Sequence, residues 1–227
     1  MISEREYRQR AQAQDDWAPG WDAITEAFDL VYQGVNPPHL AIDLASRARF
    51  GGNDYLDGVS LYPTPFGTHH LVSYGMSCLY PDPDDYGREH SGWGYEMTMQ
   101  VASASPQQCH WAVGLLSNVA RYTYTAKKWF DPYQLMVGRH EPIAQGSGSA
   151  LTGFITVPDP LVPGIDTVHG RVEFTQLVGV TQAESDWVLA DGTPGLPERC
   201  GELAERMVAA GNRTYVTDLA RTTSYLD

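Results

Sequence analysis

The sequence is poor in cysteine, with only Cys78, Cys109 and Cys200 in 227 residues. No two of them form the CxxC pair of a redox or metal site, and their odd number leaves at least one thiol unpaired in a monomer. Unpaired thiols are typical of proteins from a reducing compartment. We therefore interpret the three cysteines as small residues of the core.

Long apolar runs are also missing. No stretch approaches the roughly 20 apolar residues that a membrane-spanning helix needs. The first six residues, MISERE, carry charges where a secretion signal would be apolar. The sequence therefore predicts a soluble protein that is neither inserted into a membrane nor exported, and that stays in the cytoplasm.

Positive charge is scarce. The chain has 28 acidic residues against 15 basic ones, which gives a formal net charge of −13. The negative electrostatic field of such a chain repels the phosphate backbone that dominates nucleic-acid affinity, so DNA and RNA are disfavoured as partners. An acidic surface attracts a basic protein instead, although the same charge can serve solubility alone.

Signatures of catalysis and of metal binding are absent. The seven histidines show no HxxxH spacing. The segment from Asp82 resembles the start of a calcium loop, but Tyr86 stands at position 5 and Trp93 at position 12, where that loop needs a Glu. The segment 146–150, GSGSA, lacks the flanking elements of a phosphate loop or a nucleophile elbow. We therefore assign no catalytic residue, no metal ligand and no cofactor.

One enzymatic alternative stays open. Histidines and carboxylates that are distant in the sequence can converge in a folded site without leaving a motif. A pocket that held His69, His140 or His169 beside carboxylates would favour this alternative.

The residues that are present favour one folded domain. Hydrophobic residues make up 42% of the chain and aromatic residues 11%, enough large side chains to form a core. No repeat, heptad run or low-complexity linker divides the chain. We expect a mobile or loosely docked polar arm at residues 1–20 and a single domain at 21–227.

Alternation of apolar and polar residues predicts the strands. The pattern has period two at 71–80, 93–101, 151–157 and 172–180. The first two strands are expected to be half-buried and to pair in antiparallel fashion. A further short strand is expected at 215–219.

Helical spacing of apolar residues predicts the helices. A first helix follows from the stripe Ile24, Ala27, Phe28 and Val31. A second helix is expected at 107–124. The residues of this helix expected to face the sheet are Trp111, Leu115, Val119 and Tyr122.

Two signals near the C-terminus predict further helices. Thr181 and Glu184 have the spacing of a capping box, which begins a helix. A last helix follows from a stripe that ends at Met207, with Gly211 placed to cap it in a left-handed conformation. The stripe consists of Cys200, Leu203, Ala204 and Met207.

Five segments, in order along residues 21–219, resemble the suppressor of fused domain. The most specific are LVSYGMSCLY at 71–80 and SGWGYEMTM at 91–99. The others are GGNDYLDGVSLY at 51–62, in which Tyr55 replaces the family's usual Pro, the helix at 116–124 with ARY at its centre, and GRVEFTQLVGV at 170–180.

This resemblance implies an α+β fold, with a mixed, largely antiparallel sheet and helices packed against it, that binds another protein and catalyses no reaction. In animals the family binds Gli-type transcription factors by strand addition, between this domain and a second one. Bacterial single-domain members are proposed to include immunity proteins that neutralise toxins. The acidic chain is similar to these, which implies a basic toxin domain as the partner.

The loop between the first two predicted strands is the candidate interface. Loops on a rigid scaffold carry recognition and aromatic residues anchor interfaces, although a solvated turn is an equally simple interpretation. The candidate residues are Tyr80, Asp82, Asp84, Asp85, Tyr86 and Glu89. Tyr80 matches a family tyrosine of the partner groove, whereas Glu89 only neighbours the position of the acidic residue there. We expect a monomer, or a weak homodimer through an exposed sheet edge.

Overall fold

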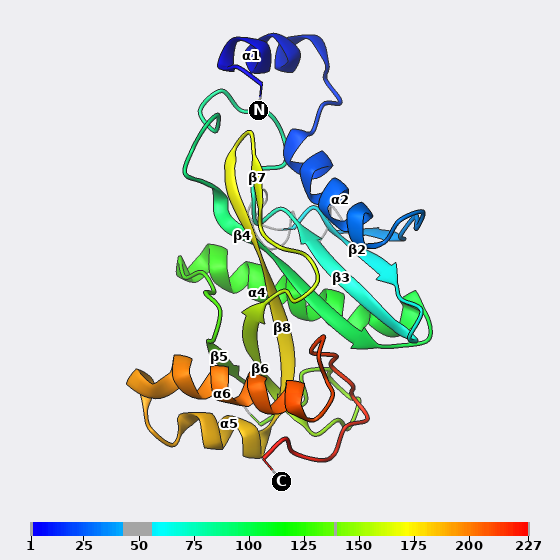
Figure 1. Cartoon of the computed structure of the whole chain (residues 1–227), viewed down its shortest axis with the longest axis vertical. Helices are drawn as coiled ribbons and strands as arrows, with labels where there is room; N and C mark the ends of the chain where they lie inside the picture. Colours follow the sequence, from blue (N-terminus) through cyan, green and yellow to red (C-terminus); the bar gives the residue numbers. More distant parts are fainter. Residues whose placement is uncertain (1, 43–55, 139, 227) are drawn as a thin grey trace.

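The computed structural model describes residues 2–42, 56–138 and 140–226. Within these residues eight strands form one sheet in the order β1-β2-β3-β4-β8-β6-β5, and β7 pairs with β8 beside this path (Figure 1). The strands are β1 (His39–Ala41), β2 (Gly58–Pro63), β3 (Thr68–Tyr74), β4 (His90–Ala102), β5 (Leu135–Val137), β6 (Leu151–Pro158), β7 (Ile165–Thr167) and β8 (Gly170–Thr181).

Five α-helices accompany the sheet in the described part of the chain. They are α1 (Glu4–Ala13), α2 (Pro19–Val31), α4 (His110–Ala126), α5 (Gln182–Leu189) and α6 (Leu196–Ala209). Two short 3₁₀ turns, η1 (Pro106–Cys109) and η2 (Thr193–Gly195), precede α4 and α6.

All neighbouring strands pair in antiparallel fashion except β4 and β8, which run parallel. The predicted fold class, α+β with a mixed and largely antiparallel sheet, is therefore confirmed. The predicted antiparallel pairing of the first two strands is confirmed by the register of β3 and β4, which places Leu71 opposite Met99.

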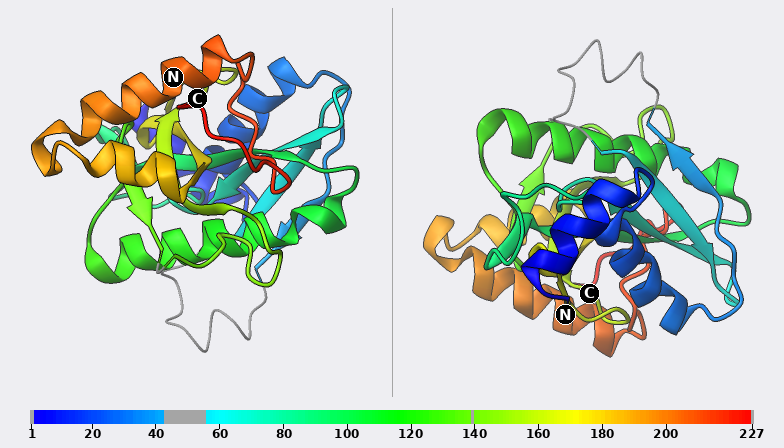
Figure 2. Two further views of the ribbon diagram at one scale, coloured as in Figure 1. Left: turned by 90° about the horizontal axis from the view of Figure 1, so that it is seen from below. Right: turned by 90° about the horizontal axis from the view of Figure 1, so that it is seen from above.

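Helices cover both faces of the sheet. α4 packs on one face, where Leu116 meets Leu71 and Met97 in one apolar cluster. α2 packs on the opposite face against an aromatic cluster, and α5 and α6 cover the part of that face formed by β6 and β8. Figure 2 shows α4 on one side of the sheet and α2, α5 and α6 on the other side.

This arrangement corrects the prediction of half-buried strands. Polar residues of β3 and β4 that alternate with the apolar ones are buried as well, among them Ser73, Glu96 and Thr98. Glu96 and Thr98 lie on the face that α2 and the segment after β6 cover, whereas Ser73 lies on the face that α4 covers. The predicted extent of the first strand is also wrong, because β3 ends at Tyr74 and a turn follows.

The predicted inward stripe of α4 is partly wrong. Val119 is buried as expected, but Tyr122 is 40% exposed. The buried residues are instead Ala112, Leu116, Val119, Ala120 and Thr123. The two alanines allow the helix backbone to approach the sheet closely, which turns the larger aromatic side chains toward the edges of the contact.

The expected mobile or loosely docked arm contains a docked helix. A capping box at Ser3 and Glu6 begins α1, and Tyr7 and Trp17 are buried. The helix itself was not expected, because most positions of α1 are polar and show no apolar stripe. A single aromatic side chain in ten residues cannot produce a helical periodicity, yet Tyr7 anchors the helix.

The predictions for the C-terminal third hold at three points. Thr181 caps α5 in a capping box with Glu184, all four residues of the predicted α6 stripe are buried, and Gly211 has a φ of 93°. The short strand expected at 215–219 is reduced to one bridge, in which Thr217 pairs in parallel with Val101.

Thr217 lies where β4 and β8 separate. The parallel register of these strands ends at Thr98 and Gln176. Beyond that point Thr217 N–H donates to the Gln100 carbonyl (2.7 Å), and the Thr217 hydroxyl accepts the Gly179 N–H (2.9 Å). The C-terminal segment thus fills the fork between the two strands.

A buried polar network holds α2 and the end of β6 against β3 and β4. The Asp159 carboxylate accepts hydrogen bonds from His70 Nε2 (2.8 Å), the Thr98 hydroxyl (2.6 Å) and two backbone N–H groups, and Tyr32 bonds to His70 Nδ1 (2.8 Å). Burial raises the pKa of Asp159, but His70, Thr98 and the backbone donors outweigh it and hold the pKa below its ordinary value.

Replacing Asp159 with Ala is expected to lower the free energy of unfolding by about 3–5 kcal/mol, because it leaves four buried donors without their acceptor. Urea denaturation measures the change. Asp166→Ala is the control, since this carboxylate is 73% exposed in its ion pair with Arg171 and its loss should cost less than about 1 kcal/mol. Equal effects of the two substitutions would contradict the role of the network.

Glu184 predicts a pH dependence of stability. Burial raises its pKa, but Arg221 and the backbone N–H groups of Thr181 and Tyr225 hold it below the ordinary 4.5. A lowered carboxyl pKa stabilises the fold above the ordinary value, and that contribution is lost as the pH falls through the folded-state pKa. The stability difference between wild type and Glu184→Gln should therefore be largest near neutral pH and shrink below pH 4.5 in urea titrations. Glu26→Gln, an exposed change on α2, should show no such trend.

Candidate partner-binding site

The candidate interface loop joins β3 to β4, and the end that leads into β4 is held by the turn between β7 and β8 and by the start of β8. Gly87 N–H donates to the Val168 carbonyl, and Arg171 N–H donates to the Glu89 carbonyl, both at 2.9 Å. Within the loop the Asp82 carboxylate accepts the Asp84 N–H at 2.9 Å. The loop therefore has a defined backbone conformation.

A turn before the loop is fixed by a buried carboxylate. Glu96 accepts hydrogen bonds from the hydroxyls of Ser73 (2.6 Å) and Ser77 (2.7 Å) and from the N–H groups of Gly75 (3.0 Å) and Ser77 (2.9 Å). Its burial raises its pKa. Gly75 is required here, because it has a φ of 124° and a Cβ would come within 2.9 Å of the Asp57 nitrogen. These contacts explain why Ser, Gly, Ser and Glu occur together in the two most specific segments of the sequence.

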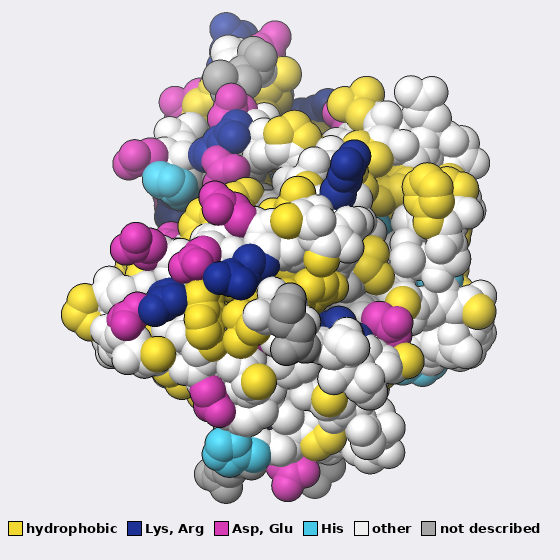
Figure 3. Space-filling model, turned by 60° about the horizontal axis from the view of Figure 1, so that its bottom comes forward, with side chains coloured by type: hydrophobic (Ala, Val, Ile, Leu, Met, Phe, Trp, Pro, Cys, Tyr) yellow, Lys and Arg dark blue, Asp and Glu magenta, His cyan; other side chains and the backbone are white. Residues whose placement is uncertain are grey.

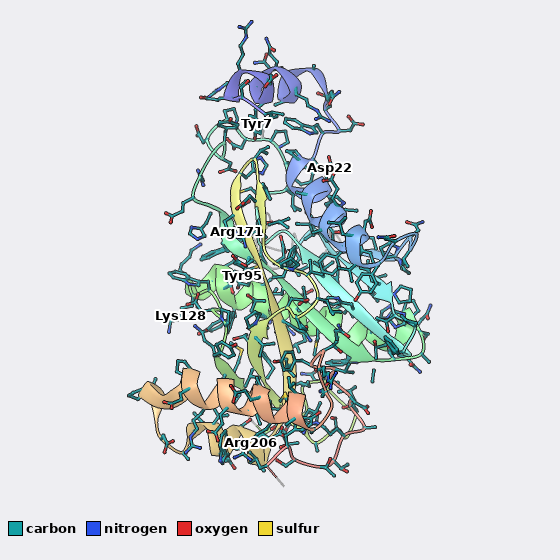
Figure 4. The ribbon with its side chains drawn as sticks, in the orientation of Figure 1. Tyr7, Asp22, Tyr95, Lys128, Arg171 and Arg206 are labelled. Atoms are coloured by element: carbon teal, nitrogen blue, oxygen red, sulfur yellow. The ribbon has the colours of Figure 1, made fainter. Side chains whose placement is uncertain are left out.

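Helix α1 covers the other side of the loop through Tyr7. The Tyr7 hydroxyl accepts the Asp82 N–H (2.8 Å) and lies 3.0 Å from the Asp82 carbonyl and 2.9 Å from His169 Nε2. Its ring packs against Trp17 and Tyr86, with centroids 5.3 Å and 5.1 Å away. Figure 4 shows Tyr7 directed from α1 toward the loop.

His169 completes this contact. Its Nδ1 lies 2.8 Å from the Cys78 carbonyl, which can only accept, so Nδ1 carries a proton. Burial lowers the pKa of His169, which favours the neutral ring with Nε2 as an acceptor. The single proton of the Tyr7 hydroxyl then goes to Nε2 or to the Asp82 carbonyl.

The six candidate residues fall into two groups. Tyr80 is 55% exposed, and Asp82, Asp84 and Glu89 are exposed as well. Asp85 and Tyr86 are partly buried. Asp85 pairs with Arg88 at 2.9 Å, and the Tyr86 hydroxyl donates to the Ile2 carbonyl at 2.8 Å. The loop thus presents an aromatic ring and three carboxylates to solvent, whereas Asp85 and Tyr86 serve contacts within the chain.

Sequence reasoning missed Tyr7 and His169 as neighbours of this loop. The capping box of Ser3 and Glu6 was the available signal, since it marks the start of a helix in the segment expected to be an arm. No local pattern connects Tyr7 with a loop that lies more than 70 positions further along the chain.

The histidines named for the enzymatic alternative lie in three different places. His69 Nδ1 bonds to the Ser103 hydroxyl (2.8 Å), His140 Nδ1 lies 2.8 Å from the Gln182 amide oxygen, and His169 contacts Tyr7. None of these bonds reaches a carboxylate. His70 does pair with Asp159, but both side chains are inaccessible to solvent, so no substrate could reach them.

Neither a metal cluster nor a membrane-spanning helix occurs in the described residues. Between residues 2 and 226, outside the two undescribed gaps, no three His, Cys, Asp or Glu side chains gather closely enough to hold a metal ion. No helix in the same part of the chain is long and apolar enough to cross a membrane.

The sequence matches a known protein family. The family model described as Suppressor of fused protein (SUFU) matches residues 52–222, so the chain belongs to the suppressor of fused family. The predicted resemblance is thereby confirmed. Of the segment 51–62 used in that prediction, residues 51–55 lie outside the described residues.

Individual relatives agree with the family assignment. The human protein "Suppressor of fused homolog" is 27% identical over 202 residues, which cover 82% of this chain and 40% of the human protein. The chain thus spans about 40% of the length of that relative.

Solved structures show the same fold. A Sufu chain from a crystal structure of the Sufu–Fu complex superposes with a TM-score of 0.75 at 24% identity, covering 92% of this chain and 93% of that chain. A SUFU homologue from Neisseria gonorrhoeae FA 1090 gives a TM-score of 0.59 at 14% identity, covering 91% and 96%.

Tyr7→Phe tests the contact between α1 and the loop. Removal of the hydroxyl leaves the Asp82 N–H without its acceptor, so we expect a loss of about 1–3 kcal/mol in the free energy of unfolding. Amide hydrogen exchange at Asp82 should accelerate at the same time. Tyr122→Phe, on α4 with a 40% exposed side chain, is the matched control and should change stability by less than about 0.5 kcal/mol. Unchanged exchange at Asp82 in Tyr7→Phe would contradict the contact.

Proposed function

We propose that this chain is a non-enzymatic protein-binding domain that sequesters a basic partner, and that it works as an immunity-type or regulatory protein. One observation carries the proposal: an exposed tyrosine and three exposed carboxylates stand on a loop whose backbone is held by hydrogen bonds to Tyr7 and to the turn between β7 and β8. Family membership supports it, since one related solved structure is that of a complex between Sufu and Fu.

The geometry of the loop supports binding more than catalysis. A preformed loop loses little conformational entropy when a partner docks, so more of the contact energy contributes to affinity. The accessible groups, Tyr80 with Asp82, Asp84 and Glu89, are an aromatic anchor and carboxylates. They suit recognition of Lys and Arg side chains.

The partner of such a surface is a basic protein, for which a toxin domain is the proposed example. The net charge of −13 steers a basic molecule toward the chain, and the loop then supplies short-range contacts. The proposed interaction takes place in the cytoplasm, where three unpaired cysteines such as those of this chain persist as thiols. No cofactor takes part.

The loop interface can be tested with a partner that is captured from native lysate and then purified. Neutralising three carboxylates in Asp82→Asn/Asp84→Asn/Glu89→Gln should weaken binding at least tenfold, about 1.4 kcal/mol, mainly through a slower association rate. Titration calorimetry and stopped-flow fluorescence measure the two quantities. The expected weakening should diminish at high salt.

The control variant changes the same number of charges elsewhere. Asp22→Asn/Glu26→Gln/Asp29→Asn removes three exposed carboxylates from α2, and Figure 4 shows Asp22 on that helix. Equal weakening by both triple variants would mean that the overall field, and not the loop, binds the partner. For the immunity role, co-expression should rescue cells from the partner's toxicity, and a lack of rescue would contradict that role.

A further inference from the structure

A groove runs along α6 at the end of the molecule opposite to α1 (Figure 1). Its volume is about 460 Å³. The residues that line it come from three separate segments: Tyr133, Pro197, Glu198, Gly201, Glu202, Ala204, Glu205 and Tyr215.

The outward face of α6 forms the floor and one wall of the groove. Glu198, Glu202 and Glu205 recur at i, i+4 and i+7 and so share one side of the helix. Gly201 and Ala204 lie between them and leave the floor low, because neither has a side chain beyond Cβ. The adjoining side of α6, to which the buried Ala204 also belongs, packs on the sheet.

Two tyrosines form the other walls. Tyr133 and Tyr215 both have left-handed backbone conformations, with φ values of 66° and 54°. Tyr133 N–H donates to the Thr156 carbonyl of β6 (2.6 Å), and the Gln176 side-chain amide of β8 donates to the Tyr215 carbonyl (3.1 Å). Both walls are therefore anchored to the sheet and stay in place when the groove is empty.

The groove is acidic and has no basic residue in its lining. Glu202 is already paired with Arg199 (3.6 Å) and Arg206 (3.3 Å), whose guanidinium groups stack on Trp187. Glu198 and Glu205 are exposed and form no ion pair with a described residue. Figure 3 shows acidic side chains beside arginine and apolar ones on the face that comes forward there, and Figure 4 places Arg206 on α6.

We propose that the α6 groove is a second docking surface, which binds an extended, arginine- or lysine-bearing segment of a protein partner. The phenol rings offer faces that attract a cation, and the two carboxylates beside them offer charge-assisted hydrogen bonds. Burial, Tyr133 and Glu205 raise the pKa of Tyr215, so its phenol is neutral and its oxygen can accept a hydrogen bond from the same cation. Arginine fits both features better than lysine, because its planar group stacks on rings while donating in its plane.

This surface is distinct from the loop at 80–89. The loop and α6 lie at opposite ends of the sheet, so a basic partner could use either alone or span both (Figure 1). Binding at the α6 groove depends on the residues that line it and does not require the loop interface.

The test uses a defined probe, the peptide acetyl-Gly-Arg-Arg-Gly-amide, and its counterpart with citrulline in place of both arginines. Titration at low salt, followed by NMR of the labelled protein, should show the arginine peptide shifting the amide signals of 198–205 and 215. Citrulline keeps the shape but not the charge, so its peptide should bind at least about tenfold more weakly.

Two double variants separate the groove from the general field. Glu198→Gln/Glu205→Gln should weaken binding of the arginine peptide at least about tenfold. Asp22→Asn/Glu26→Gln removes two exposed charges from α2, outside both proposed interfaces, and should leave the affinity for this groove within about twofold. Both pairs are exposed, so folding is expected to persist, and the unfolding midpoint checks it.

Three results would overturn the proposal: no binding of the arginine peptide at millimolar concentration, equal binding of the citrulline peptide, or equal weakening by the two double variants. Failure of the groove would leave the loop interface untouched, since that interface is tested with other variants and with a captured partner.

Discussion

The position of the loop between β3 and β4 depends on one buried carboxylate. Glu96 sits in the middle of β4 without a cationic partner, a costly position that is tolerated because four hydrogen bonds from Ser73, Gly75 and Ser77 surround it. These bonds fold the chain sharply after β3 and direct it back toward β4. The loop that follows inherits its position from them, so a group with no access to solvent determines where the exposed carboxylates stand.

Buried polar groups also fix the position of a neighbouring element on the face of the sheet that α2 covers. Most sheets bury apolar side chains on the face that a helix covers, but here Asp159, His70 and Thr98 join beneath α2. Such a network is directional, because each donor must meet its acceptor, whereas apolar contacts tolerate sliding. The network therefore fixes the position of α2 relative to the sheet, while the aromatic cluster around Phe28 supplies the buried area.

The sequence allowed prediction where the pattern is local. β6, β8 and α6 were predictable because long alternations and a four-residue stripe report burial directly, and Thr181 marked the start of α5 by its own chemistry. The docking of α1 was not predictable, because Tyr7 is the one buried residue of this helix and its neighbours are mostly polar. For the candidate site, the exposure of Asp82 and Asp84 could be expected from their loop, but the hydrogen bond of Tyr86 to Ile2 depends on a residue far away in the chain. The α6 groove was hidden for the same reason, since its tyrosine walls come from two distant segments.

The fork between β4 and β8 has a consequence for how the molecule assembles. Gln100 bonds to Thr217, a residue more than a hundred positions further along, and so does Gly179 on the neighbouring strand. Contacts of such large sequence separation form late, because a long loop must close before they gain any energy. On the ribosome β4 and β8 can pair with each other as far as Thr98 and Gln176, but the fork beyond these residues cannot be filled until residue 217 has left the exit tunnel. We therefore expect the insertion of this segment between β4 and β8 to be a late step of folding, which completes the sheet.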